Sequence, residues 1–336
     1  MENIQNFQVL WFGLIFVLLL GYSLLDGFDL GLATLLPFIA RKQEERDLLL
    51  GAIGPVWDGN EVWLITGGGA LFAAFPHAYA TAFSGFYTAM LLVLFALIFR
   101  AVAMEFRVLD KTRPGLWEKA LTVGSALAAL LFGVALGNVI YGVPLDERME
   151  FTGHFFTLLR PVPLLFGMTG LAAVLLQGAA YAAMKTEGTL RERSLQILRV
   201  LAGLNAVTAI TYFTVLAAVF PELPSHPLFY AAVLVTLLGL AGVFLALGGK
   251  RDSAPFWASS LSFTGLWLAA GAAQFPHLIR ASNDPRWSLT IHKSSTGLLT
   301  LQVMSVIALV GMPIVIGYTL FVYRIFKGKT RPSDNY

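Results

Sequence analysis

Long apolar stretches, separated by short polar segments, run along nearly the whole chain. A membrane-spanning helix needs about 20 predominantly apolar residues, and none of these stretches alternates apolar and polar positions as the strands of a membrane β-barrel do. The pattern predicts an all-α polytopic membrane protein. Its nine expected helices lie at about 9–36, 54–75, 79–99, 117–139, 161–184, 198–219, 228–248, 255–275 and 299–323.

The lysines and arginines predict the orientation, because cytoplasmic segments collect them. With nine spans and the N-terminus outside, the inner side holds 18 of the 23 basic residues. These are Arg41, Lys42, Arg46, Arg100, Arg107, Lys111, Arg113, Lys119, Lys185, Arg191, Arg193, Arg199, Lys250, Arg251, Arg324, Lys327, Lys329 and Arg331. The outer side holds Arg148, Arg160, Arg280, Arg286 and Lys293. We therefore expect an external N-terminus and a cytoplasmic C-terminus.

Composition excludes several classes of protein. Hydrophobic residues make up 57% of the chain and charged residues 13%, about half the charge of a soluble domain. A soluble globular protein, a disordered chain and a nucleic-acid-binding protein are thereby disfavoured. The chain has no cysteine, which excludes disulfides, iron–sulfur clusters, thiolate zinc sites and thiol catalysis. The N-terminus lacks the basic residues that begin a cleaved secretory signal, so 9–36 is expected to be retained.

Four carboxyl side chains fall inside predicted spans, where ionisable groups are costly and usually functional. Asp26 and Asp29 lie in the first span, and Asp58 and Glu61 in the second. Each pair is spaced i, i+3 and so shares a helix face. At 1.5 Å per residue, Asp26 lies about 25 Å from the outer start of its span. All four are therefore expected at a similar depth, in the inner half of the membrane.

Three interpretations of these carboxyls remain open. Desolvated carboxyls that lie close together hold protons readily, so the group suits a proton entrance from the cytoplasm. Alternatively, Asp26 or Asp58 caps a helix break or pairs with an arginine such as Arg100. A divalent metal site is disfavoured, because no histidine lies nearby and the spacing is not that of a calcium loop.

The histidines argue against a haem bound by this chain. A haem between transmembrane helices takes histidine or methionine ligands from facing helices. All five histidines are expected in outer loops or at outer helix ends: His77, His154, His226, His277 and His292. We therefore expect no directly bound haem.

Several segments together resemble subunit II of cytochrome bd-type quinol oxidases. The first two are Asp-Gly-Phe-Asp-Leu-Gly at 26–31 and Trp-Asp-Gly-Asn-Glu-Val-Trp-Leu-Ile-Thr at 57–66. The others are Gly-Gly-Ala-Leu-Phe-Ala-Ala at 68–74, Ala-Phe-Ser-Gly-Phe-Tyr at 82–87, Phe-Arg at 99–100, Gly-Asn at 137–138, Gly-Val-Pro at 142–144 and Gln-Gly-Ala at 177–179. The likeness runs in order from about residue 8 to 325.

The resemblance implies a fold and a set of partners. Members have nine helices, arranged as two four-helix bundles plus one peripheral helix. They form a heterodimer with subunit I, which carries haems b and d, or b only. The complex, in some cases with small single-helix accessory subunits, sits among the lipids of the bacterial cytoplasmic membrane. It oxidises quinol, reduces oxygen to water with protons from the cytoplasm, and does not pump. Some members hold a structural quinone in subunit II.

The resemblance also implies roles for individual residues. Asp29 and Asp58 look like the family's proton-path carboxylates, and Asp26 belongs to the same motif. Glu61 departs from the family pattern, in which glutamine is common. Trp63 matches an aromatic residue near a proposed oxygen route. No catalytic residue is expected in this chain.

A secondary transporter that couples ions through these carboxyls is the alternative function. Transporters usually bind near the midplane between two repeats. The carboxyls here are expected away from the midplane, and nine spans do not divide into equal halves, so both features count against it.

Overall fold

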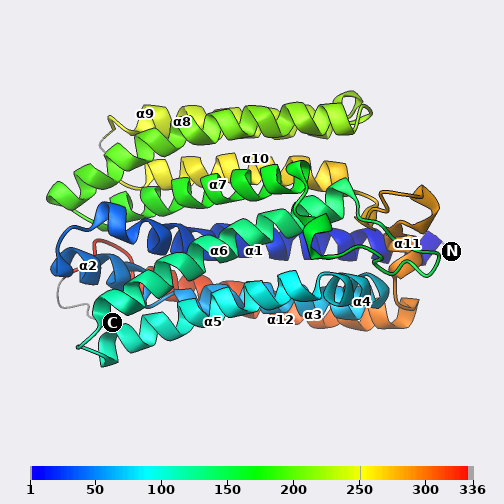
Figure 1. Ribbon diagram of the computed structural model, residues 1–336, viewed down its shortest axis with the longest axis horizontal. Coiled ribbons are helices and arrows are strands. Elements are labelled where there is room, and N and C mark those ends of the chain that lie inside the picture. The colour runs from blue at the N-terminus through cyan, green and yellow to red at the C-terminus, as the bar shows by residue number, and fades with distance from the viewer. Residues whose placement is uncertain (1, 250, 332–336) are drawn as a thin grey trace.

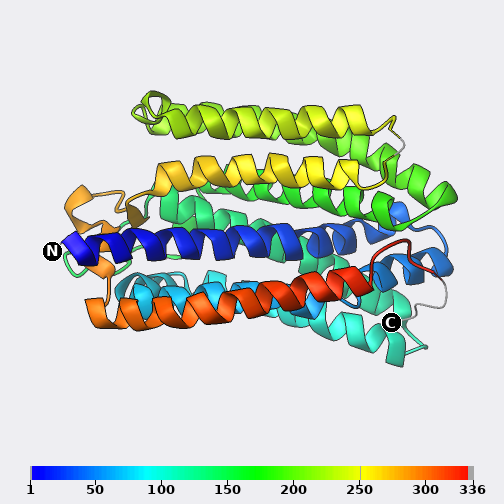
Figure 2. The same ribbon diagram turned by 180° about the vertical axis from the view of Figure 1, so that it is seen from behind.

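Helices running side by side along one axis form the body of the protein (Figures 1 and 2). The computed structural model describes residues 2–249 and 251–331; Lys250, counted above among the inner basic residues, lies outside them. α1 begins at one end of the bundle and α12 ends toward the opposite one. We call the end that holds the start of α1 and the connections 142–160, 220–226 and 275–297 the N-face. The opposite end, with 40–56, 110–113 and 186–187, is the C-face.

The chain forms these helices and strands in order. The helices are α1 (Glu2–Ile39), α2 (Gln43–Ile53), α3 (Trp57–Ala74), α4 (Pro76–Gly85), α5 (Tyr87–Leu109), α6 (Pro114–Tyr141), α7 (Pro161–Lys185), α8 (Gly188–Val219), α9 (Pro227–Ala246), α10 (Ala254–Gln274), α11 (Ile291–Ser294) and α12 (Leu298–Ile325). Short 3₁₀ turns are η1 (Phe155–Leu158), η2 (Leu223–Ser225) and η3 (Pro285–Trp287). At the N-face, β1 (His277–Ile279) pairs antiparallel with β2 (Leu289–Thr290).

Seven helices in the described ranges are long and apolar enough to cross a membrane: α1 from Asn3, α5, α6, α7, α8, α9 and α12. This confirms an all-α polytopic membrane protein. The predicted count of nine spans is not confirmed. The other two expected spans form α3 and α10, which lie alongside the seven but carry more polar residues. Asp58 and Glu61 lie in α3, and α10 holds Ser259, Ser260 and Ser262.

Proline sets the starts of several helices. Pro76, Pro114, Pro161 and Pro227 are each the first residue of a helix, where a missing N–H costs nothing and the fixed φ suits the first turn. After α6 the chain turns at Gly142, whose φ of +100° favours glycine. These local signals account for most of the boundaries between spans.

The structure differs from the predicted boundaries in several places. α1 begins at Glu2 and α8 at Gly188, well before the predicted starts at 9 and 198. The stretch expected at 79–99 is interrupted at Phe86, between α4 and α5, and helix then continues to Leu109. The loop at 142–160 packs closely against this interruption, since a Cβ on Gly85 would overlap the side chain of Phe151. The segment before the second span also forms a helix of its own, α2, whose buried residues include Leu49, Leu50 and Ile53.

α1 lies at the centre and packs against α3, α6, α7, α10 and α12. Its closest approach is to α7. A Cβ on Gly31 would overlap the backbone carbonyl of Val174, and a Cβ on Gly178 would overlap the backbone of α1. Small residues allow such backbone contact between membrane helices. Gly31 therefore has a packing role within the segment 26–31.

α12 is the peripheral helix. It runs along α1 on the outside of the bundle (Figure 2), and Leu301 is its one buried residue among those described. Residues along the rest of its length, such as Leu309, Ile314 and Leu320, are largely exposed.

Candidate functional site

A buried arginine forms the centre of the polar cluster in the bundle. Arg100 on α5 is 1% exposed. Its two terminal nitrogens donate to both carboxylate oxygens of Asp26 on α1, at 2.6 and 2.9 Å. One of them also donates to Oε1 of Glu61 on α3, at 2.9 Å. Three helices thus meet at a single guanidinium, which is the group best shaped for bidentate carboxylate binding.

The cluster lies in a nearly dry environment. Asp26 is fully buried, whereas the side chain of Glu61 is 23% exposed. The ring of Trp57 lies 5.9 Å from the Arg100 guanidinium carbon. Charges removed from water are expensive unless they are paired and hydrogen-bonded. Asp26 and Arg100 meet that requirement through two contacts, and Glu61 is the member of the cluster that reaches the surface.

Asp29 lies beside this cluster, one helical turn after Asp26, and is fully buried. Its Oδ2 accepts a hydrogen bond from Nδ2 of Asn60 at 2.7 Å, and its Oδ1 has no partner among the described residues. Asn60 Nδ2 also donates to the carbonyl of Leu25 at 3.1 Å. The hydroxyl of Tyr323 donates to Asn60 Oδ1 at 2.8 Å.

The predicted site residues therefore fall into two environments. Asp26, Asp29 and Glu61 come together around Arg100 and Asn60, while Asp58 is exposed on the first turn of α3. The pairing of Asp26 with Arg100 was one of the open interpretations, and the structure shows it. Asp58 lies three residues before Glu61, so the two share a helix face.

Trp63 lies between α3 and α1, apart from the carboxyls. A Cβ on Gly21 would lie 2.5 Å from its ring, and its buried indole nitrogen has no hydrogen-bond partner among the described residues. The indole of Trp63 thus occupies space that a side chain at position 21 would fill. A role in an oxygen route stays a prediction.

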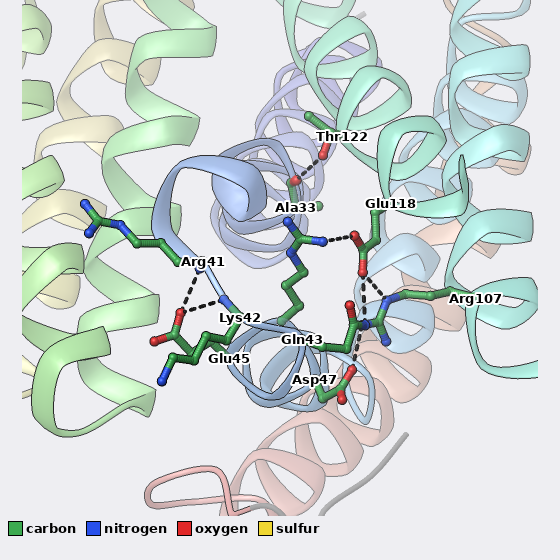
Figure 3. Close-up of polar contacts among 10 residues, drawn as sticks. Ala33, Arg41, Lys42, Gln43, Glu45, Asp47, Arg107, Glu118 and Thr122 are labelled. Atoms are coloured by element: carbon green, nitrogen blue, oxygen red, sulfur yellow. Dashed lines mark hydrogen bonds and ion pairs between the residues drawn. The ribbon is translucent and has the colours of Figure 1, made fainter. Parts of the chain in front are cut away.

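A second polar network closes the C-face (Figure 3). Glu118 on α6 accepts hydrogen bonds from Gln43 and Arg46 of α2 and from Arg107 of α5, at 3.3, 2.7 and 3.0 Å. Arg107 also pairs with Asp47 at 2.6 Å. Because α2 follows α1 directly, these bonds fix the first connection across the end of the bundle.

Glu45 holds the other side of α2. It accepts hydrogen bonds from the backbone amides of Arg41 and Lys42 at 2.7 and 3.2 Å (Figure 3), and it pairs with Arg193 of α8. The hydrogen bond from Arg193 is the main cause that lowers the pKa of Glu45 to about 2, and the bonds from the two amides contribute to the same shift. This carboxylate therefore stays ionised and keeps α2 attached at any physiological pH.

An apolar cavity of about 270 Å³ lies between α1, α6, α7 and α10. Its wall is largely aliphatic and aromatic, and its hydroxyl-bearing residues are Tyr22, Ser23, Thr169 and Tyr212. Ser23 and Tyr212 donate to backbone carbonyls, whereas the hydroxyl oxygens of Tyr22 and Thr169 are buried without a hydrogen-bond partner among the described residues. Tyr22 lies one turn before Asp26 on α1, so the cavity adjoins the charged cluster. A second cavity of about 160 Å³ shares Leu19 and Trp267 with it.

The histidines lie at the N-face. His77 is in the first turn of α4 and His277 in β1, and His154, His226 and His292 lie in or beside the connections. His292 hydrogen-bonds Gln8 at 2.6 Å. In residues 2–249 and 251–331 there is no group of three or more His, Cys, Asp or Glu side chains placed to hold a metal ion.

His277 gives a pH dependence that can be measured. The ordinary pKa of a histidine is about 6.5. Burial is the main cause that lowers the pKa of His277 to about 4, and the charges of Arg280 and Lys293 contribute to the same shift. Between these values the unfolded chain binds a proton that the folded chain does not, so stability falls as the pH drops from about 6.5 to about 4. We expect the Tm in detergent to fall by roughly 2 °C or more over this range from this group alone.

The measurement compares wild type with His277→Gln at several pH values. As the pH falls, the Tm of wild type should decrease more than the Tm of His277→Gln. His154→Gln, at an exposed loop histidine, should keep the wild-type profile. Identical profiles for wild type and His277→Gln would contradict the assignment.

Sequence reasoning missed part of the site. Asn60 lies inside the segment 57–66 but carries no charge, so its charged neighbours Asp58 and Glu61 were predicted as site residues instead. Tyr323 is 263 positions from Asn60, and no local pattern brings the two together. The network at Glu118 was also missed, although the acidic first turn and apolar end of 43–53 are typical of a helix lying at an interface.

Comparisons with known proteins match the whole length of the chain. The family model "Cytochrome bd terminal oxidase subunit II" matches residues 7–326. The chain is similar to cytochrome bd-I ubiquinol oxidase subunit 2 of Escherichia coli strain K12, at 36% identity over 99% of this chain and 98% of the relative. It is also similar to cytochrome bd ubiquinol oxidase subunit 2 of Bacillus subtilis strain 168, at 33% identity over 97% of each.

A solved structure has the same fold. The bd oxidase of Geobacillus thermodenitrificans superimposes with a TM-score of 0.79 at 18% sequence identity, over 96% of this chain and 98% of that one. The seven membrane-length helices and the bacterial relatives identify a multi-pass protein of the bacterial inner membrane. The chain belongs to the cytochrome bd terminal oxidase subunit II family.

Proposed function

We propose that this chain is the haem-free subunit of a quinol oxidase and that it supplies protons to a haem-bearing subunit I. The observation that carries the proposal is the group of three carboxyls, Asp26, Asp29 and Glu61, around the buried Arg100. Ionisable groups at such a depth are costly and are a mark of ion or proton pathways. The redox centres and the quinol-oxidising site belong to the partner, and the complex oxidises quinol and reduces oxygen to water without pumping.

The orientation supports proton uptake from the cytoplasm. The C-face carries most of the lysines and arginines, including those of α2 and of the connection 110–113, which the positive-inside rule assigns to the cytoplasm. Asp58 and Glu61 lie in the first two turns of α3, which begins at this face. A proton taken up at the C-face therefore meets Asp58 first.

The order of burial suggests a route. Asp58 is exposed, Glu61 is partly exposed, and Asp26 and Asp29 are fully buried. We assign the first transfer to Asp58 and Glu61, and the next from Glu61 inward to Asp29. Arg100 holds Glu61 and Asp26 in place but does not itself carry the proton. Arg100 pairs with both carboxylate oxygens of Asp26, whereas Asp29 has no cation bonded to it among the described residues and is the carboxyl to which we assign the proton.

The exposed face of α3 suits the contact with subunit I. It is formed by Asp58, Val62, Ile65, Gly69 and Phe72. A carboxylate facing lipid is unfavourable, and a Cβ at Gly69 would meet open space, which allows another helix to approach closely. With subunit I against this face, Asp58 becomes an interface residue, and Trp63 lies just behind the surface near an oxygen route.

The 270 Å³ cavity suits a structural quinone. Its wall matches an isoprenoid chain, and the hydroxyls of Tyr22 and Thr169 supply two hydrogen-bonding groups for carbonyl oxygens. A bound quinone would fill the space between α1, α6, α7 and α10 and stiffen the bundle.

Mild solubilisation followed by a reduced-minus-oxidised optical spectrum tests the proposed assembly. We expect this chain to co-purify with a larger haem-bearing partner, and the band positions to show whether haem d or only haem b is present. The chain expressed without the partner should bind no haem. A well-folded, colourless preparation with no partner, from cells that express both subunits, would overturn the proposal and favour an ion-coupled transporter.

A further inference from the structure

We propose that Tyr323, acting through Asn60, is a positioning residue for Asp29, so that the docking of the peripheral helix α12 controls the buried carboxyl. The inference rests on the proposed proton role of Asp29. Tyr323 lies on α12, outside the bundle, and its hydroxyl would act on the proposed proton path.

The first step is the way α12 is attached. Within the described residues, side-chain hydrogen bonds join it to the bundle near both ends, and its C-cap Phe326 accepts a further one from Lys185 of α7. Near the N-face, Nε1 of Trp11 donates to the carbonyl of Leu301 and to Oγ of Ser305, both at 3.1 Å. Toward the C-face, Tyr323 donates to Asn60 at 2.8 Å. A helix with one buried residue depends on such anchors for its place.

The second step is the orientation of the Asn60 amide. Asn60 is 1% exposed, and an asparagine side chain presents one accepting oxygen and one donating NH₂ group. The Tyr323 hydroxyl is a donor to the oxygen, which turns the NH₂ group toward Asp29 and the carbonyl of Leu25. Without the Tyr323 hydroxyl, the Asn60 oxygen would be buried without this donor, which weakens the hold on the amide that bonds Asp29.

The third step is the dependence of Asp29 on Asn60. The amide of Asn60 is the hydrogen-bond donor to Asp29 among the described residues, and Asp29 Oδ1 has none. The ring of Tyr323 also packs edge-on against Phe28, with ring centres 6.4 Å apart. Tyr323→Phe therefore keeps the ring contact and removes only the hydroxyl that orients Asn60.

The test uses the assembled oxidase with quinol as electron donor. We expect Tyr323→Phe to lower kcat about three- to tenfold, the effect of losing one buried hydrogen bond. The KM for quinol and the haem content should not change, because neither depends on Asp29. Tyr318→Phe is the matched control, since Tyr318 is an exposed tyrosine on the same helix, and it should keep the wild-type kcat.

Coupling to Asp29 separates positioning from a general structural role. In an Asp29→Asn background, Tyr323→Phe should have almost no further effect on kcat, because residues that act through one another are not additive. An unchanged kcat in Tyr323→Phe, or an equal fold-loss in both backgrounds, would overturn the inference. If Asp29→Asn alone has wild-type turnover, the proposed proton role of Asp29 fails instead.

Discussion

Arg100→Ala is expected to abolish the stable, assembled subunit. The substitution leaves Asp26 fully buried with no cation bonded to it and deprives Glu61 of its partner. Removing one partner of a buried ion pair typically costs about 3–5 kcal/mol, a large part of the 5–15 kcal/mol that stabilises an ordinary protein. We expect little folded complex after detergent extraction and a Tm well below that of wild type for what remains.

Variants at the same position and nearby make this expectation specific. Arg100→Lys should rescue only partly, because an ammonium group does not reproduce the bidentate contact with Asp26. The double variant Arg100→Gln with Asp26→Asn should recover much of the yield, since it removes both buried charges together. Arg199→Gln, at an exposed arginine, serves as the control. Wild-type yield and Tm in Arg100→Ala would show that Asp26 and Glu61 are stable without the cation.

Asp29→Asn and Asp58→Asn are expected to cause a large loss of turnover with the haems still assembled. Each change keeps the shape of the side chain and removes its ability to carry a proton. Loss of a proton-transferring group typically costs 10²–10⁴-fold in rate, so we expect quinol-driven oxygen consumption to fall by about 100-fold or more. Glu44→Gln, at an exposed residue of α2 on the C-face, should have wild-type activity.

The haem spectrum distinguishes the two explanations of a loss. A slow enzyme with a normal reduced-minus-oxidised spectrum supports a role in proton transfer. A slow enzyme that has lost haem indicates that the carboxyl is needed for assembly. Normal oxygen consumption in either variant removes that residue from any obligatory proton path.

The sequence predicted the helices better than their interruptions. Apolar length is a property of one segment, so most long helices were found within a few residues of their ends. The interruption at Phe86 was missed because it occurs where the 142–160 loop meets α4, which is a tertiary contact. α2 was missed because it is too short to span a membrane and its attachments come from α5, α6 and α8.

The site was predictable where charged residues lie inside predicted spans. Asp26, Asp29 and Glu61 stood out because charged residues are rare in apolar spans, and three helices bring them together. Their division into roles was not predictable, because it depends on which side chain Arg100 reaches and on burial. Asn60 and Tyr323 are neutral residues that many membrane helices contain, so only the folded arrangement distinguishes them.

Proton uptake during turnover tests the central claim, that protons reach the oxygen-reducing partner through the carboxyls of this subunit. The oxidase is reconstituted in vesicles with a known orientation, and proton uptake at the C-face is followed with a pH dye after an oxygen pulse to the quinol-reduced enzyme. The account predicts uptake from the C-face in step with oxygen consumption, and uptake slowed about 100-fold in Asp58→Asn with haem content unchanged. Wild-type uptake in Asp58→Asn, or uptake from the N-face, would contradict it.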